Sequence, residues 1–307
     1  MCGSGGHDGG DIGVQSITRQ VMELPAAAAL SSVPMNTSMN ALRHATRPVG
    51  DLLREWRQRR RMSQLDFAVE AEISSKHLSF LETGRSQPSR EMVLHLAELL
   101  DVPLRERNSL LIAAGFAPMF KEHALTDPEL QPAREAVELV LRGHQPYPAV
   151  CVDRHWQLVA ANDAANFFMA GVAPALLAAP LNVLRATLHP DGMAPRIVNL
   201  AEWRAHVLAR LRRQIEVSAD AVLADLLKEL SEYPAPAGSA HTAAPATTAV
   251  PFAVPFRLAT DAGVLIFIST ITVFGTPVDV TLSELALESF FPADAATAAA
   301  LRSLAQQ

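Results

Sequence analysis

Cysteine is scarce in this chain, and the two cysteines stand far apart. Cys2 and Cys151 are the only ones among 307 residues, so neither a disulfide framework nor a cysteine metal site is expected. Long apolar runs are missing as well. Although 49% of the residues are hydrophobic, no uninterrupted run approaches the roughly 20 residues that cross a bilayer. The sequence therefore predicts a soluble, cytoplasmic protein of two domains that does not enter a membrane.

The common signatures of catalysis are also missing. The sequence contains no His-Glu-x-x-His helix, no Gly-x-Ser-x-Gly turn and no phosphate-cradling glycine loop. His189 and Asp191 carry acid–base groups, but Pro190 between them and Gly192 after them favour a structural loop. We therefore expect no enzyme, no cofactor and no metal site.

The clearest pattern that is present is a pair of short helical segments joined by a tight turn. Ser63 suits the N-cap of the first segment. Leu65, Ala68 and Val69 then follow at i, i+3 and i+4 spacing, which predicts that they form its buried side. Gln64 is left outward at the first turn. The first segment is thus expected to be a short amphipathic helix.

The second segment begins at another candidate cap, Ser74. Leu78 and Leu81 form its buried stripe, and Gly84 ends it in the left-handed conformation. Only a few residues around Glu72 separate the two segments, so the helices must cross steeply. Such a crossing is typical of helix-turn-helix units, whose second helix enters the major groove of DNA.

Three further helices are expected around this pair. They cover residues 49–60, 89–100 and 103–114, and each repeats apolar residues at helical spacing. Their apolar faces supply the hydrophobic surface that two short helices lack. The five segments together predict one compact helical domain.

This five-helix segment resembles the Xre/Cro-type helix-turn-helix of phage repressors. Gln64 and Ala68 match the family's Gln-x-x-x-Ala opening, and Glu82-Thr83-Gly84 matches its ending. Glu72 stands where many members have glycine, and a non-glycine residue takes the left-handed backbone of such a turn only at some cost. The resemblance implies a lambda-repressor-like DNA-binding domain over residues 47–116.

The resemblance also implies, by position, which side chains meet double-stranded DNA. The residues expected at base edges are Ser75, Lys76, Ser79 and Phe80, and those expected at phosphates are Gln64, Arg57, Arg61 and Arg85. In the alternative, the arginines form an ordinary solvated face and Phe80 belongs to the core. Residues 43–121 hold 13 Lys or Arg and 10 Asp or Glu, a balance of +3 in a chain of net charge −6. Attraction to DNA must therefore be local, through the arginine cluster.

Two stretches lie outside this domain pattern. Residues 1–46 begin with a glycine-rich run and continue without an apolar period, so we expect a disordered N-terminal arm. Residues 117–146 are expected to form a connector that contains a helix from about 127 to 141.

Residues 147–305 are expected to form a second domain of mixed strands and helices. Cys151 lies in an apolar, strand-like run and is expected to be a small core residue. The expected strands are 149–152, 156–160, 254–260, 264–274 and 279–290, and the expected helices are 174–188, 201–230 and one after Asp294. Asn162 is expected to cap a further helix directly after the first hairpin. A hairpin followed by such a helix is similar to the opening of a PAS-type sensor domain.

The second domain resembles the MmyB-like ligand-binding domain found behind Xre-type helices in bacterial transcription regulators. The likeness is carried by residues 148–162, 181–185, 189–192, 199–204, 279–288 and 291–294. Residues 234–251, rich in alanine, proline and threonine, are expected to be a flexible insertion. The two resemblances imply a mainly α chain with an α+β second domain, in which a PAS-like antiparallel sheet packs against helices.

The second resemblance implies a PAS-like cavity for a fatty-acid-like or other small amphipathic molecule. The strand at 264–274 is apolar, and its alternate residues could line such a pocket. The candidate ligand contacts are Asn162, Arg196, Asn199, Arg204, His206, Thr270 and Thr272. In the alternative, Asn162 is a helix cap and Arg204 is an ion-paired or surface residue.

These expectations combine into a one-component bacterial transcription regulator. Its first domain would bind an operator as a homodimer, because one helix-turn-helix reads too few base pairs for tight specific binding. Its second domain would bind a small-molecule effector and change how the two DNA-binding domains are held. The alternative is a constitutive repressor whose second domain serves only dimerisation.

Overall fold

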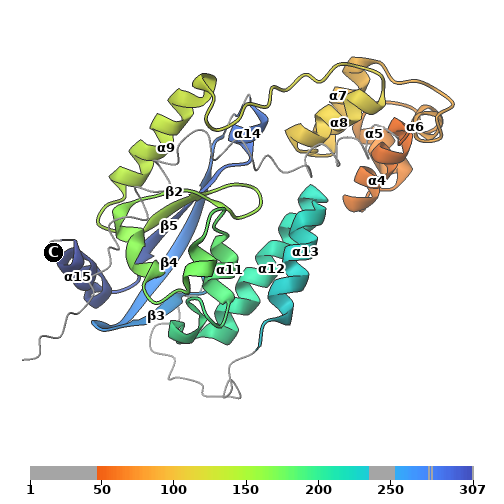
Figure 1. Ribbon diagram of the computed structural model, residues 1–307. Coiled ribbons are helices and arrows are strands. Elements are labelled where there is room, and N and C mark those ends of the chain that lie inside the picture. The colour runs from red at the N-terminus through yellow and green to blue at the C-terminus, as the bar shows by residue number, and fades with distance from the viewer. Residues whose placement is uncertain (1–46, 235–252, 276, 278, 306–307) are drawn as a thin grey trace, which may run out of the picture.

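The computed structural model describes residues 47–234, 253–275, 277 and 279–305 (Figure 1). The expected arm at 1–46 and nearly all of the expected insertion at 234–251 lie outside the described residues. Figure 1 shows a small group of helices at the right and a larger domain built on a sheet at the left. Every helix of the described residues is too short or too polar to span a bilayer.

Five helices form the first domain, as the sequence predicts. They are α4 (Val49–Arg59), α5 (Gln64–Glu70), α6 (Ser75–Glu82), α7 (Arg90–Leu99) and α8 (Leu104–Ala113). Ser63, Ser74 and Ser89 cap α5, α6 and α7, because each side chain accepts a hydrogen bond from the backbone N–H three residues later. The helices meet in one core, in which Leu53 and Leu96 are completely buried.

The buried side of α5 differs from the predicted one. Leu65 and Val69 are 64% and 70% exposed, whereas Phe67 and Ala68 are buried. Phe67 and Ala68 form a stripe with Ala71, at spacings of four and three residues, that faces the core. Two helical stripes were available, and the one that buries the large phenylalanine ring is the one that forms.

The turn between α5 and α6 has the conformation that the sequence predicts to be costly. Glu72 has a φ of +55°, in the left-handed region. The N–H of Glu72 donates to the Val69 carbonyl at 3.1 Å, and the N–H of Ile73 donates to the Ala68 carbonyl at 2.9 Å. These two hydrogen bonds close the end of α5 and turn the chain into α6.

A five-stranded antiparallel sheet is the centre of the second domain. Its order is β2-β1-β5-β4-β3. The strands are β1 (Ala149–Val152), β2 (Leu158–Ala161), β3 (Phe256–Thr260), β4 (Gly263–Val273) and β5 (Ala286–Pro292). The first hairpin and the three late strands are therefore present, and the α+β class of this domain is confirmed.

Helices cover one face of the sheet with the main hydrophobic core. They are the 3-10 helix η2 (Asp163–Met169), α10 (Pro174–Leu177), α11 (Val183–Leu188), the 3-10 helix η3 (Ala194–Arg196), α12 (Leu200–Ser218) and α13 (Ala221–Glu232). Phe256, Phe267 and Phe290 reach this core from the strands, and Leu211 and Leu223 reach it from α12 and α13. In Figure 1 these helices lie at the right of the sheet, between it and the first domain.

The helix expected in the connector packs on the second domain. After a short 3-10 turn, η1 (Pro128–Leu130), the helix α9 (Gln131–Gly143) places Val137 and Leu141 against Ala149 and Cys151 of β1. Cys151 is a buried core residue as predicted, and burial raises the pKa of its thiol to about 12. The closing helix α15 (Ala295–Leu304) packs beside β4 and β5.

Two of the expected elements are each divided in two. The expected strand at 279–290 begins with a helical turn, α14 (Val280–Ser283), because the Asp279 side chain accepts hydrogen bonds from the N–H groups of Thr281 and Leu282. The expected helix at 201–230 breaks at Ala219, which has a φ of +59°, and Asp220 caps the next helix. In both places a local side-chain hydrogen bond starts a new helix.

The strained turn at Glu72 can be tested by substitution. We expect Glu72→Gly to raise the free energy of unfolding by up to about 1 kcal/mol, since glycine accepts a positive φ at no steric cost. Glu72→Val should lower it by about 1 kcal/mol or more, because a β-branched side chain tolerates this backbone worst. Urea unfolding followed by circular dichroism measures both changes.

Glu70→Gly is the matched control, because Glu70 is exposed in the regular last turn of α5. Glycine there should destabilise by about 1 kcal/mol. A Glu72→Gly variant that unfolds at lower urea than the unchanged protein contradicts the prediction.

Candidate functional site

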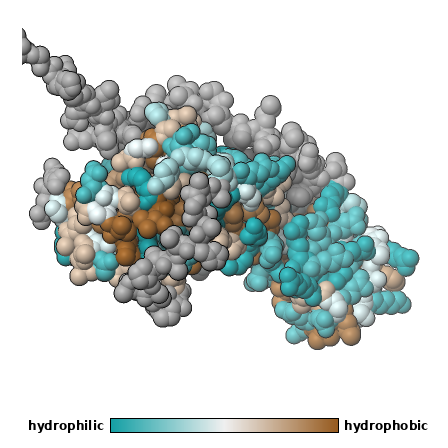
Figure 2. Space-filling model, turned by 90° about the horizontal axis from the view of Figure 1, so that it is seen from below, coloured by the Kyte–Doolittle hydropathy of each residue, from teal (hydrophilic) through white to brown (hydrophobic). Residues whose placement is uncertain are grey.

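The outer face of α6 presents the four residues that the sequence predicts at base edges. Ser75 and Lys76 are exposed, and Ser79 and Phe80 are partly exposed. Lys76 Nζ lies 5.7 Å and Arg85 Cζ lies 5.8 Å from the centre of the Phe80 ring. Phe80 is therefore at the surface between two cations, and not in the core. The end of the molecule that carries these helices is largely hydrophilic in Figure 2.

Glu82, in the last turn of α6, holds three side chains of the first domain, although its own side chain is completely buried. Its carboxylate accepts hydrogen bonds from Arg57 Nε at 2.6 Å, from Gln64 Nε2 at 2.7 Å and from Arg54 Nε at 3.4 Å. Burial opposes the charge of Glu82, but these hydrogen bonds outweigh it and hold the pKa of Glu82 below its ordinary value. Glu82 thus ties α4, α5 and α6 together.

The predicted phosphate contacts separate into two groups. Arg57 is only 7% exposed, and besides Glu82 it donates to a backbone carbonyl just after α4 at 2.7 Å. Its donors are engaged inside the domain, so the structure places Arg57 in the framework and not on the outer face that we expected. Arg61 and Arg85 are exposed, and Gln64 is partly exposed and oriented by Glu82.

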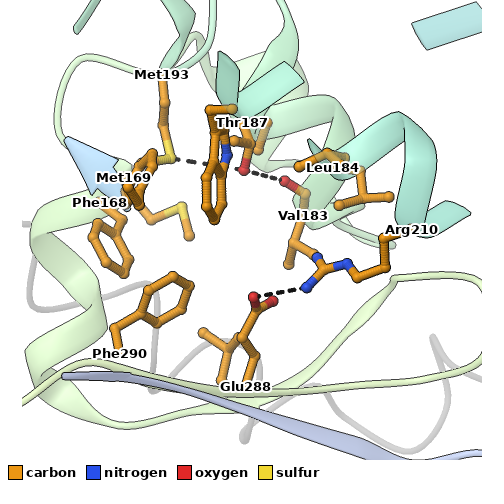
Figure 3. Close-up of a pocket in the computed structure, with 14 residues that line it drawn as sticks. Phe168, Met169, Val183, Leu184, Thr187, Met193, Arg210, Glu288 and Phe290 are labelled. Carbon is orange, nitrogen blue, oxygen red and sulfur yellow. Dashed lines mark hydrogen bonds and ion pairs between the residues drawn. The ribbon is translucent and has the colours of Figure 1, made fainter. Parts of the chain in front are cut away.

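A small cavity lies in the second domain between the sheet and its helices (Figure 3). It is lined by Val150, Phe168, Met169, Val183, Leu184, Ala186, Thr187, Met193, Trp203, Val207, Arg210, Phe256, Glu288 and Phe290. Most of these side chains are apolar, as in ligand pockets generally. Figure 3 shows Phe168, Met169 and Phe290 on one side of the cavity and Arg210 with Glu288 on another.

The polar part of the cavity wall is an ion pair. Arg210 Nη1 donates to Glu288 Oε1 at 3.0 Å, and the side chains are only 15% and 6% exposed. Arg210 Cζ also lies 4.3 Å from the centre of the Trp156 ring, whose Nε1 donates to Gln214 at 2.8 Å. A buried charge needs a partner, and here Arg210 has both an anion and an aromatic face.

Three of the candidate ligand contacts are engaged by backbone groups. Asn162 accepts a hydrogen bond from the Ala149 N–H at 3.0 Å and donates to two backbone carbonyls, so it joins α9 to the first hairpin and does not cap η2. Arg196 donates to the Phe168 carbonyl, and burial lowers the pKa of Arg196. Arg204 donates to two carbonyls at the end of α13.

Asn199 and His206 also face other parts of the domain. Asn199 bonds two backbone groups at the start of β3, which fixes that strand to α12. His206 stacks on Trp203 with 5.4 Å between ring centres. Burial lowers the pKa of His206, and the charges of Arg210 and Arg213 lower it further.

Thr270 and Thr272 lie on the face of the sheet that is turned away from the cavity. Residues paired across antiparallel strands share a face. Thr270 is paired with Ser289 and Thr272 with Leu287, whereas the cavity residue Glu288 occupies the alternate position. None of the seven candidate contacts is among the 14 residues that line the cavity.

Sequence reasoning missed Arg210 and Glu288, although each carries a detectable signal. Arg210 stands three residues after Val207 on the buried stripe of α12, where an apolar residue is expected. Glu288 alternates with Phe290 on the buried face of β5. A charged residue on a buried stripe usually has a buried partner, and two such residues of opposite sign suggest a pair.

The two domains meet through a cluster of charged side chains. Arg105 of α8 forms two hydrogen bonds, of 2.8 and 2.9 Å, with the carboxylate of Glu284, which stands between α14 and β5. Arg105 also pairs with Glu122 at 2.6 Å, and Arg154 in the first hairpin lies 3.5 Å from Glu284. Burial opposes the charge of Arg105, but the two carboxylates outweigh it and raise the pKa of this guanidinium above its ordinary value. Ala219, at the tip of α12, packs on the core of the first domain.

No group of His, Cys, Asp and Glu side chains in the described parts of the chain is arranged to hold a metal ion. The polar groups that remain are those of the α6 face, the cavity wall and the domain contact. They are suited to binding and not, by their arrangement, to a particular reaction.

The buried carboxylate of Glu82 provides a stability test. We expect Glu82→Ala to lower the free energy of unfolding by about 3–5 kcal/mol, because it leaves Arg57 buried without its anion. Glu55→Ala is the matched control, since Glu55 pairs with Arg47 and Arg59 at the surface and should cost less than about 1 kcal/mol. Thermal unfolding measures both, and equal costs would contradict the assigned role of Glu82.

The pH dependence has a defined sign. Because the pKa of Glu82 is lowered on folding, its contribution is fully present above the ordinary pKa of 4.5 and is lost as the pH falls through the lower folded value. Glu82→Gln should therefore reduce the loss of stability of the protein in acid. An acid-unfolding curve that is unchanged by this substitution is the contrary result.

Comparison with known proteins identifies both domains. A family model described as the MmyB-like transcription regulator ligand binding domain matches residues 133–304, and one described as a helix-turn-helix domain matches residues 48–110. No curated protein matches the chain. The first match starts inside α9, in agreement with the packing of that helix on the sheet. These are the two families that the sequence resembles, so the chain belongs to the MmyB-like transcription regulators and carries their ligand-binding domain behind a helix-turn-helix domain.

Proposed function

We propose that this DNA-binding transcription regulator reads a specific operator with α6 and responds to a small effector in the cavity of its second domain. Ser75, Lys76, Ser79 and Phe80 contact base edges, and Arg61 and Arg85 contact phosphates. The exposure of Ser75 and Lys76 beside the cationic edge of Phe80 supports this assignment. Gln64 contacts a phosphate from the start of α5, oriented by Glu82.

The protein acts as a homodimer in the cytoplasm, where operator DNA is present. One helix-turn-helix contacts only a few base pairs, and two copies on adjacent turns of DNA supply the affinity that a specific regulator needs. The effector is small, with an apolar, fatty-acid-like body. The single observation that carries the effector proposal is the apolar cavity with a buried ion pair in its wall.

Contacts connect this cavity with the DNA-binding domain. Arg210 in the wall stacks on Trp156, and Trp156 shares Gln214 with the backbone carbonyl of Arg154. Arg154 in turn lies next to Glu284, the residue that binds Arg105 of α8. A ligand that moves Arg210 therefore shifts the hairpin that borders the domain contact. Allosteric coupling through such a contact amounts to about 1–3 kcal/mol in typical cases.

The DNA-binding assignment predicts two kinds of mutational effect. Arg61→Glu and Arg85→Glu should weaken binding to all sequences and reduce the salt dependence of binding by about one ion per contact. Lys76→Ala should instead lose about 1–3 kcal/mol on the preferred sequence and relax the choice of base at one position. Fluorescence anisotropy with duplexes selected from a random pool measures both effects.

Arg142→Glu is the control, because Arg142 is an exposed residue of α9 in the second domain. Its affinity for the selected duplex should stay at that of the unchanged protein. Full affinity in the Arg61 and Arg85 variants would exclude the proposed phosphate face.

The coupling route predicts a variant that separates the two activities. We expect Glu284→Gln to bind a panel of short-chain acids and amides as the unchanged protein does, and to bind DNA without ligand. The ligand-dependent change in DNA affinity, about 5–150-fold in coupled systems, should be reduced. Glu229→Gln is the control, since Glu229 pairs with Arg185 at the surface of the second domain.

Thermal unfolding decides between the sensor and a constitutive repressor with a purely dimerising second domain. A saturable rise in melting temperature with members of the panel supports the sensor. Intact dimers without any rise support the constitutive repressor.

A further inference from the structure

The cavity wall contains hydrogen-bond donors without an acceptor. Trp203 Nε1 and Arg210 Nε are buried and have no hydrogen-bond partner among the described residues. Both residues line the cavity, and they are seven residues apart on α12, two helical turns along the same face. Folded proteins rarely leave a buried donor unpaired, so a cavity with two of them is matched to a molecule that brings an acceptor.

The charge of the wall is already balanced. Arg210 is paired with Glu288, whose side chain is only 6% exposed. A carboxylate in the cavity would have to compete with Glu288 for Arg210, and the displaced Glu288 would remain buried without a cation. Arg210 is also fixed by its stacking on Trp156, so the pair does not open freely. The site therefore disfavours a second anion.

The size of the cavity limits the ligand further. The space open to the centres of water-sized molecules is about 50 Å³, which accommodates roughly four water-sized groups. Met169 and Met193 form part of the wall, and the flexible methionine side chain lets such a wall widen around a short chain. Phe168 and Phe290 supply an apolar surface for the body of the ligand.

We propose that the cavity binds a short, uncharged molecule with an apolar body and one or two carbonyl oxygens, such as an amide or ester, in preference to a free carboxylate. The carbonyl oxygens accept hydrogen bonds from Trp203 Nε1 and Arg210 Nε, while the Arg210–Glu288 pair stays closed. This inference rests on the proposed effector function and narrows the chemical class of the effector.

The test compares two probes of equal length on the full chain at pH 7.5. Hexanamide and hexanoate share their apolar body and differ in the charge of the polar end. Calorimetric titration is expected to show at least tenfold tighter binding of hexanamide. Equal or tighter binding of hexanoate overturns the inference but leaves an effector domain in place. Binding of neither probe overturns the proposed effector function together with the inference.

Variants distinguish this reading from simple apolar binding. Glu288→Gln removes the competing carboxylate and frees the charge of Arg210, so the preference should reverse by at least tenfold in favour of hexanoate. Trp203→Phe keeps a ring and removes the donor, and it should weaken hexanamide roughly fivefold. Arg257→Lys is the matched control, because Arg257 Nε is also a buried donor without a partner but lies outside the cavity wall. An unchanged preference in Glu288→Gln, with the native circular dichroism spectrum, refutes the assigned charge balance.

Discussion

The buried ion pair between Arg210 and Glu288 is the constraint that organises the second domain. It joins α12 to β5 across the core, where an unpaired charge of either sign would be strongly unfavourable. Two charged groups cannot pack as closely as the phenylalanines around them, and the cavity lies beside the pair. The same constraint fixes Trp156 through the Arg210 guanidinium. Cavity shape, wall charge and the position of the first hairpin thus have one common cause.

The segment that supplies Glu288 also supplies the contact with the DNA-binding domain. Glu284 stands four residues earlier, where α14 leads into β5, and it is bound by Arg105 of α8. Two carboxylates close together in the chain therefore serve the cavity and the domain contact. A short antiparallel strand is stiff along its length because its neighbours bond it on both sides. Movement of β5 at the cavity is thus expected to reach Glu284 and α8.

Local patterns predicted the elements of this fold better than the functional side chains. Ser74 caps its helix as predicted, because the N-cap depends on residues only three apart. Leu65 was expected in the core, but the larger Phe67 takes that place, which depends on the partner helices. Thr270 was placed near a ligand, whereas the strand register, set by β5, turns it to the other face. Arg210 was overlooked because its partner is 78 residues away in the sequence.

The chemistry of the domain contact suits a switch. The contact consists of ion pairs and hydrogen bonds among Arg105, Glu122, Arg154 and Glu284, whose arginines are 17% and 23% exposed. Partly exposed ion pairs stabilise an interface only modestly, since water competes for each charge. A large apolar interface would hold the two domains in one arrangement against any small ligand. With a polar contact, a coupling free energy of about 1–3 kcal/mol is enough to shift the population of domain arrangements. The position of the DNA-reading helix can therefore respond to a few atoms in a cavity of the other domain.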